Sequence, residues 1–245
     1  MFRILLLLSF FIPNVCLAYE CNREIDSLSD QYGVKILCDL GKINLPARMT
    51  AEEVGKRKLN DAVPALRSFF SIYDSNFLRK NIISISLVSD IRVSNVEVGG
   101  LSNGREIFLN VRSYNSRYFE TNAYIETLHH EFSSNVFKRV PQEFRRNWKL
   151  ISDSYDYSRE YYMKCLQNVD FAEGVSEGNL NLGYIENYSV TNEENDFNTY
   201  AEKLFMKNPL LLKNAKTHQI IRKKINYLKI MYRHLGFTGN FPDET

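Results

Sequence analysis

The sequence lacks an excess of either charge. Its 31 lysine and arginine residues nearly balance 29 acidic residues, which leaves a net charge of +2. A charge this small produces no field that favours nucleic acid or an anionic membrane surface as a partner. Internal repeats, low-complexity tracts and a glycine-rich phosphate loop are also missing. These absences argue against charge-driven binding and against the common nucleotide-binding motifs.

A hydrophobic run long enough to span a bilayer is missing as well. The apolar stretch Ile4–Ile12 follows Arg3 and ends at Pro13, and this length is too short for a transmembrane helix. A basic residue, a short apolar run and a small residue at Ala18 are typical of a secretory signal peptide. We therefore predict that Met1–Ala18 is removed and that the mature chain is periplasmic or secreted, with no stable membrane span. An uncleaved anchor is the alternative.

Cysteine is scarce, with three residues left after the predicted signal peptide. Disulfides form in the compartments that exported proteins reach. Cys21 and Cys38 flank a short segment, so we predict that they pair and that Cys165 remains a free, buried thiol. The alternative is three reduced cysteines in the core.

What the chain does have is enough apolar surface for a sizeable core, since 44% of its residues are hydrophobic and 13% are aromatic. We predict one domain over residues 19–245, with a sheet and a central helix up to residue 140 and a mainly helical part in residues 141–245. Ile82–Val93 is rich in β-branched residues and is expected to be a central strand. Glu106–Val111 is expected to be an edge strand, joined to the preceding strand by a glycine-rich turn. The expected fold class is α+β, with a small, mostly antiparallel sheet packed on helices.

Two capping boxes and one long apolar pattern mark further helices. Thr50 stands three residues before Glu53 and is expected to begin a helix over Ala51–Asn81. Thr191 stands three residues before Glu194 and is expected to begin another. Apolar residues at helical spacing predict a single helix over Asn214–Leu235.

The helix expected over Thr121–Arg139 carries the one constellation that suggests chemistry. Ile125, Leu128, Phe132 and Val136 share one face at helical spacing, and this face is expected to be core. His130, Glu131 and Ser134 point away from it, with His129 at its margin. A solvated helix face is the simplest interpretation.

The spacing supports a sharper interpretation. Zinc peptidases use His-Glu-x-x-His because residues four apart on a helix point the same way, so two imidazoles share one metal while the glutamate polarises the bound water. Here the pattern runs His130-Glu131-Phe132-Ser133-Ser134. A serine stands where the second histidine would be.

The segment Thr127–Phe132 resembles the active-site helix of gluzincin metallopeptidases, particularly the small bacterial secreted ones. Gly104–Ser113 matches the extended edge strand that precedes this helix in such enzymes. Glu194–Asn198 resembles a weakened form of the Glu-Asp-Phe-Ala signature on their second helix. The resemblance therefore implies a zincin-like fold and a peptide or protein substrate.

Carried over by residue, the resemblance makes His130 a zinc ligand, Glu131 the general base, and Asp196 or Glu194 the acidic ligand. Asp196 is preferred because Glu194 already has a capping role available. The resemblance implies peptide-bond hydrolysis with zinc as the cofactor. The departure at Ser134 supports the alternative of a catalytically inactive relative that binds a peptide or an envelope component in the periplasm. A secreted structural protein with these residues on its surface is a third possibility.

Overall fold

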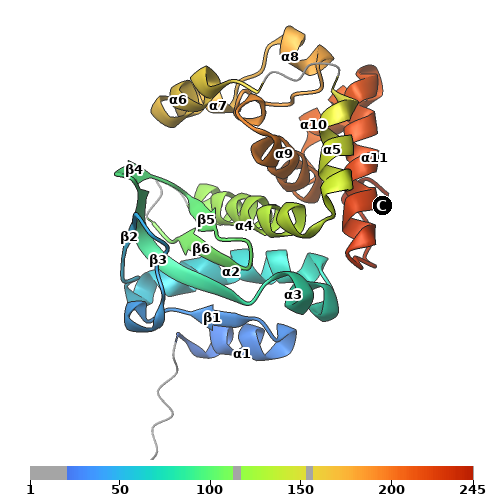
Figure 1. Cartoon of the computed structure of the whole chain (residues 1–245). Helices are drawn as coiled ribbons and strands as arrows, with labels where there is room; N and C mark the ends of the chain where they lie inside the picture. Colours follow the sequence, from blue (N-terminus) through green and yellow to red (C-terminus); the bar gives the residue numbers. More distant parts are fainter. Residues whose placement is uncertain (1–20, 113–116, 153–156, 245) are drawn as a thin grey trace, which may run out of the picture.

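The computed structural model describes residues 21–112, 117–152 and 157–244. The chain is a mixed α+β protein in which a small sheet packs with helices (Figure 1). The predicted fold class is thus confirmed. The predicted signal peptide, Met1–Ala18, lies outside the described residues.

The sheet is organised around the ten-residue strand β3 (Ser84–Val93), whose apolar residues are mostly fully buried, as the β-branched run predicts. Its partners are β1 (Lys35–Leu37) and β6 (Glu106–Asn110) in parallel, and β2 (Met49–Glu52) and β4 (Val96–Glu97) in antiparallel orientation. The strand β5 (Gly100–Ser102) pairs antiparallel with β6 and completes the order β1-β3-β6-β5. The end of the sheet at β5 is the one that faces the candidate site.

In its described residues, the N-terminal half supplies four helices and one short turn of 3-10 helix. They are α1 (Arg23–Tyr32), η1 (Leu40–Lys42), α2 (Lys56–Ile72), α3 (Ser75–Asn81) and α4 (Arg117–Arg139). α4 contacts β5 and β6 on one side and the later helix α9 on another, so it lies between the sheet and the C-terminal helices (Figure 1).

The C-terminal half is helical in the part that the structure describes. Its elements are α5 (Gln142–Ile151), α6 (Arg159–Gln167), α7 (Val169–Glu173), α8 (Glu177–Asn181), η2 (Tyr188–Val190), α9 (Glu193–Phe205), α10 (Pro209–Thr217), α11 (Gln219–His234) and η3 (Pro242–Glu244).

Aromatic rings join helices from both halves in one core. The ring of Tyr73, which follows α2, lies 4.7 Å from Phe132 of α4 and 5.1 Å from Phe205 of α9. Phe205 in turn lies 5.2 Å from Tyr232 of α11. Tilted and edge-on ring contacts of this kind stabilise a core beyond the area that they bury. They fix α4 against α9, and the site lies between these two helices.

The prediction that a helix begins at Thr50 is wrong. Residues Met49–Glu52 form β2, which pairs with the C-terminal half of β3, and α2 begins only after its cap at Gly55. A local capping pattern was thus overridden by strand pairing across the sheet. Pro64 lies inside α2 without ending it, and the break comes at Tyr73 instead.

The predicted edge strand is also wrong. β6 lies between β3 and β5, because the glycine-rich link before it forms a strand of its own. The edge is β5, which is short and begins at Gly100.

The single helix predicted over Asn214–Leu235 is two helices. His218 has an extended backbone and separates α10 from α11, and its ring lies 3.1 Å from Glu177.

The predicted disulfide is confirmed: Cys21 and Cys38 are bonded, and Cys165 is free and buried. No helix within the described ranges is long and apolar enough to cross a membrane.

Candidate functional site

α4 has the core face that its spacing predicts. Leu128, Phe132 and Val136 have no exposed surface. His129 joins this face, since it is fully buried and its Nδ1 lies 2.9 Å from the hydroxyl of Tyr73. Burial lowers the pKa of His129 to about 3, so its ring is neutral at pH 7. His129 is therefore a core residue.

His130 faces α9. Its Nδ1 lies 2.7 Å from Oε2 of Glu202, and the two side chains are 15% and 9% exposed. Burial by itself would lower the pKa of His130, but the hydrogen bond and charge of Glu202, with the charges of Glu131 and Glu126, outweigh it and raise the pKa to about 9. The imidazole is therefore a cation at pH 7, with Nδ1 already occupied.

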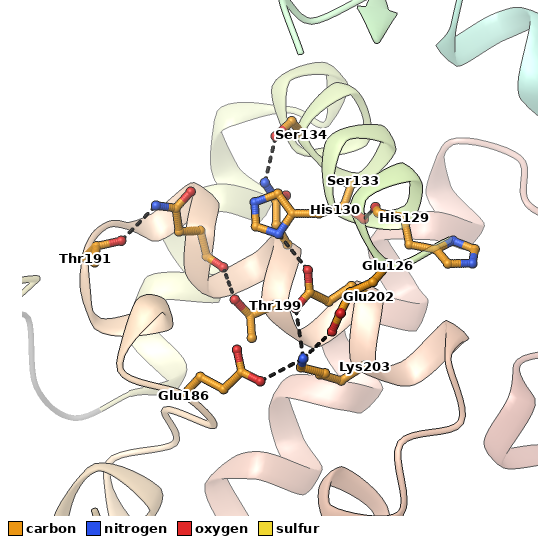
Figure 2. A network of polar contacts seen from close by, with 12 residues as sticks. Glu126, His129, His130, Ser133, Ser134, Glu186, Thr191, Thr199, Glu202 and Lys203 are labelled. Carbon is orange, nitrogen blue, oxygen red and sulfur yellow. Dashed lines mark hydrogen bonds and ion pairs between the residues drawn. The ribbon is translucent and has the colours of Figure 1, made fainter. Parts of the chain in front are cut away.

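The ammonium of Lys203 lies next to three carboxylates, one of which is that of Glu202 (Figure 2). Its ammonium contacts Glu126 of α4 and lies 2.8 Å from Glu186 and 3.4 Å from Oε1 of Glu202. Burial raises the pKa of Glu186 to about 8, although the charge of Lys203 opposes the rise. We call Glu126, His130, Glu186, Glu202 and Lys203 the charge network. It connects α4, α9 and the segment before η2.

A cavity of about 280 Å³ opens beside the charge network. One wall is the chain from Val98 to Gly100, and another is α4, with Thr127, His130 and Glu131. A Cβ at Gly100 would lie 2.6 Å from Cγ2 of Thr127 and 3.1 Å from Cγ of Glu131, so β5 approaches α4 closely. The cavity is thus a cleft between a sheet edge and the polar face of α4.

Glu131 also lines this cleft. Among the residues that the structure describes, no hydrogen bond or ion pair reaches its carboxylate. Burial raises the pKa of Glu131, against the opposing charge of His130. Glu131 thus points away from the core face of α4, as the helical spacing predicts.

Ser134 lies one helical turn after His130 and faces a different partner. Its Oγ accepts a hydrogen bond of 2.6 Å from Nδ2 of Asn198 on α9. Both residues are buried, at 3% and 1% exposure, and Oδ1 of Asn198 has no partner in the described part of the chain. The position that the zinc motif gives to a second histidine therefore holds a neutral, buried pair.

Asp196, predicted as a metal ligand, lies elsewhere. It has no exposed surface, and its Oδ2 lies 2.7 Å from Nζ of Lys224 and 2.9 Å from Nε1 of Trp148. Tyr157 donates a third hydrogen bond, at 3.3 Å. Asp196 is therefore held in an ion pair that joins α9 to α11 and α5, away from the charge network.

Glu194 is not brought to His130 either. Its carboxylate lies 2.9 Å from Nζ of Lys138, and both side chains are about one-third exposed, at 33% and 39%. The cap of α9 is Asn192, whose side chain accepts from the N–H of Asn195, so the predicted cap at Thr191 is wrong.

A catalytic zinc site takes three protein ligands and one open position. Within residues 21–112, 117–152 and 157–244, no three His, Cys, Asp or Glu side chains gather in a way that could hold a metal ion. A serine hydroxyl and an asparagine amide are poor zinc ligands, so the residues beside His130 do not fit the zinc site that the motif implies.

The architecture has a counterpart among solved structures. A "putative zinc-binding metallo-peptidase" from Bacteroides caccae matches with a TM-score of 0.54, over 86% of this chain and 89% of that chain. The chain has a metallopeptidase-like fold. At 14% identity the likeness shows the fold alone. No protein-family model and no curated protein matches the chain.

Sequence reasoning missed most of the partners of His130 and Ser134 at this site. Glu202, Lys203 and Asn198 come from α9, and Glu126 lies one turn before His130 on α4. The only signal for them is the four-residue spacing of Asn198 and Glu202, which puts both on one stripe of α9. The stripe predicts partners for His130 and Ser134 only if α9 is already known to pack on α4.

Proposed function

We propose that this chain is an exported, non-hydrolytic protein that uses a metallopeptidase-like fold to bind an extended peptide in the cleft beside β5. The observation that carries the proposal is the pair Ser134–Asn198, which puts two neutral side chains where a hydrolytic site would need metal ligands. A cleft is present beside this pair, with His130 and Glu131 in its wall.

Within the described residues β5 pairs only with β6, and its unpaired edge supports peptide binding. The N–H of Asn110 donates to the carbonyl oxygen of Gly99 at 2.9 Å, and the N–H of Asn103 donates to that of Glu106 at 3.2 Å. The odd-numbered positions from Gly99 to Asn103, which include the residues on either side of β5, therefore bond to β6. In an antiparallel pair the residues between them direct their backbone groups outward. Gly100 and Ser102 therefore offer hydrogen bonds to an added strand beside the cleft.

Export is part of the proposal. It rests on the charged, apolar and small residues of Met1–Ala18, and on the disulfide Cys21–Cys38, which requires an oxidising compartment such as the periplasm or the exterior.

Zinc-dependent peptide hydrolysis is the second candidate. It is favoured by the hydrogen bond between Nδ1 of His130 and Glu202, which resembles the support of metal-bound histidines, and by Glu131, which lines the cleft and could act as the base. It would need ligands beyond those that this chain brings to His130.

The proposal is tested with a display library of linear peptides selected on the chain lacking residues 1–18. The selected peptides are resynthesised, and their affinities are measured by fluorescence anisotropy. Mass spectrometry then determines whether each peptide stays intact. We expect binding without cleavage.

Backbone methylation provides the matched control. Replacing alternate N–H groups of one bound peptide by N-methyl should abolish binding in one register and leave it nearly unchanged in the other, because only every second residue of an added strand bonds to β5. Equal losses in both registers would refute strand addition. Cleavage that stops with a zinc chelator would establish the second candidate instead.

A further inference from the structure

Among the polar pairs that join α4 to α9, two lie side by side, and each takes one residue from each helix (Figure 2). His130 bonds Glu202 at 2.7 Å, and Ser134 bonds Asn198 at 2.6 Å. The partners on each helix are four residues apart, so the two pairs lie one turn apart along facing stripes of antiparallel helices.

The first pair has the form of a metal-binding histidine with its supporting acid. A histidine that binds a metal through one ring nitrogen usually donates the other N–H to a carboxylate, which fixes the ring. Glu202 takes Nδ1 of His130 in this way, and His130 lines the cleft. One ligand and its support are therefore in place.

Ser134 and Asn198 occupy the positions of two further zinc ligands, but their neutral side chains are poor ligands for zinc. Ser134 follows His130 by four residues, the spacing at which two side chains share a metal. Nδ2 of Asn198 donates to Ser134, and among the described residues Oδ1 of Asn198 is buried without a hydrogen-bond partner. An acid at position 198 would have its oxygen beside the side chain at position 134.

We infer that Ser134 and Asn198 stand at the two positions where a zinc site on α4 and α9 lacks its ligands. Ligating side chains at these two positions complete a three-ligand site with His130, and the native chain holds no zinc there. The inference concerns the metal and does not depend on whether the cleft binds a peptide.

Two double variants test the inference. Ser134→His with Asn198→Glu supplies the usual zinc ligands. Glutamate is chosen because its longer side chain can reach a metal bound by the larger histidine. Ser134→Cys with Asn198→Asp keeps the buried volumes almost unchanged and guards against a failure to fold, because a thiolate is also a strong zinc ligand. Zinc binding is measured by calorimetric titration after treatment with a chelator, and folding by near-ultraviolet circular dichroism.

We expect about one zinc per chain and an affinity at least ~100-fold above that of the native chain in a folded double variant. Each single variant should gain much less. In the same background, His130→Ala should abolish the gain, and Glu202→Gln should reduce it by roughly 10- to 100-fold, as loss of the supporting acid does in other zinc sites.

Three results would overturn the inference. One is a native chain that already binds one zinc tightly through His130, since no ligand would then be missing. Another is a folded double variant with no gain in zinc affinity. The third is misfolding of both designs, because it would show that these positions cannot accept ligating side chains.

Discussion

Lys224 is a lysine without exposed surface, and its ammonium is satisfied within the protein. Nζ lies 2.7 Å from Asp196 and 2.9 Å from the carbonyl oxygen of Gly183. It also lies 4.7 Å from the ring centre of Tyr184 and 5.4 Å from that of Trp148. Burial lowers the pKa of Lys224, while the charge and the hydrogen bond of Asp196 oppose this shift. Asp196, the acid expected at a metal centre, thus forms an ion pair that holds helices together.

Removing the lysine alone should be costly. Lys224→Met leaves the Asp196 carboxylate buried without its cation, so we expect a loss of about 3–5 kcal/mol in the free energy of unfolding, measured in urea. Lys223→Met, at the exposed neighbouring position, is the control and should change it by less than about 0.5 kcal/mol. Adding Asp196→Asn to Lys224→Met should recover part of the loss, because no buried charge then remains. Equal effects of the two lysine substitutions would contradict this account.

The pair His130–Glu202 should make stability depend on pH. The pKa of His130 is raised from 6.5 to about 9 in the folded chain. Because the folded value lies above the unfolded value, the pair contributes stability that is complete below pH 6.5 and is lost as the pH rises through 9. Its size is on the order of 3 kcal/mol.

The measurement is urea unfolding of the native chain and of His130→Gln at pH values on both sides of this window. The free-energy difference between the two proteins should shrink as the pH rises, and Glu202→Gln should weaken the same pH dependence. A difference that stays constant with pH would show that His130 is not held as a cation by Glu202.

Residue spacing on a single helix was predictable, and contacts between helices were not. The period of α4 correctly separated Phe132 and Val136 from the cleft residues His130 and Glu131. It could not show that His130 meets Glu202, because that contact depends on the packing of two segments 72 residues apart. The preference for Asp196 rested on a motif and on a cap at Thr191 that α9 does not use.

At the scale of elements, the close contact between β5 and α4 defines the cleft. It requires a residue without a side chain at Gly100, where a Cβ would lie 2.6 Å from Thr127 and 3.0 Å from the carbonyl oxygen of Phe108. The carbonyl oxygen of Phe108 cannot move away without shifting β6, and the methyl group of Thr127 can move only by rotation about one bond.

Gly100→Ala should therefore push β5 away from α4. We expect a loss of about 1–3 kcal/mol in the free energy of unfolding and weaker binding of any peptide held along the strand. The matched control is Gly178→Ala, because the nearest atom to its Cβ would be Oγ of Ser176 at 3.7 Å. If both substitutions have the same small effect, the close approach does not constrain the cleft.

Elements with a strong pattern of their own were predictable from the sequence, and elements defined by a partner were not. The β-branched run Ile82–Val93 predicted the end of β3 at Val93 and its start to within two residues. β2 was mistaken for the start of a helix, because Thr50 and Glu53 form a capping pattern that pairing with β3 overrides. β5 was expected to be a turn, since glycines rarely favour a strand unless a close neighbour requires them.

At the scale of the whole molecule, the disulfide ties the N-terminal helix to the sheet. Cys21 and Cys38 are 17 residues apart and bracket α1 and β1. Cross-linking a loop of this length restricts the unfolded chain by about 3 kcal/mol.

Cys21→Ser with Cys38→Ser should lower the free energy of unfolding by about 3 kcal/mol in urea. The control is Cys165→Ser, which breaks no disulfide. In the chain lacking residues 1–18, alkylation under denaturing conditions followed by mass spectrometry should find one thiol before reduction and three after it. Three thiols before reduction would reject the disulfide.

We propose that hydrogen bonds and ion pairs join α4 to α9 beside the cleft of this metallopeptidase-like fold, and that His130 binds no zinc there. The most direct test is a calorimetric zinc titration of the chelator-treated native chain. The account predicts no stoichiometric binding that depends on His130. A tight site for one zinc per chain that disappears in His130→Ala would contradict it.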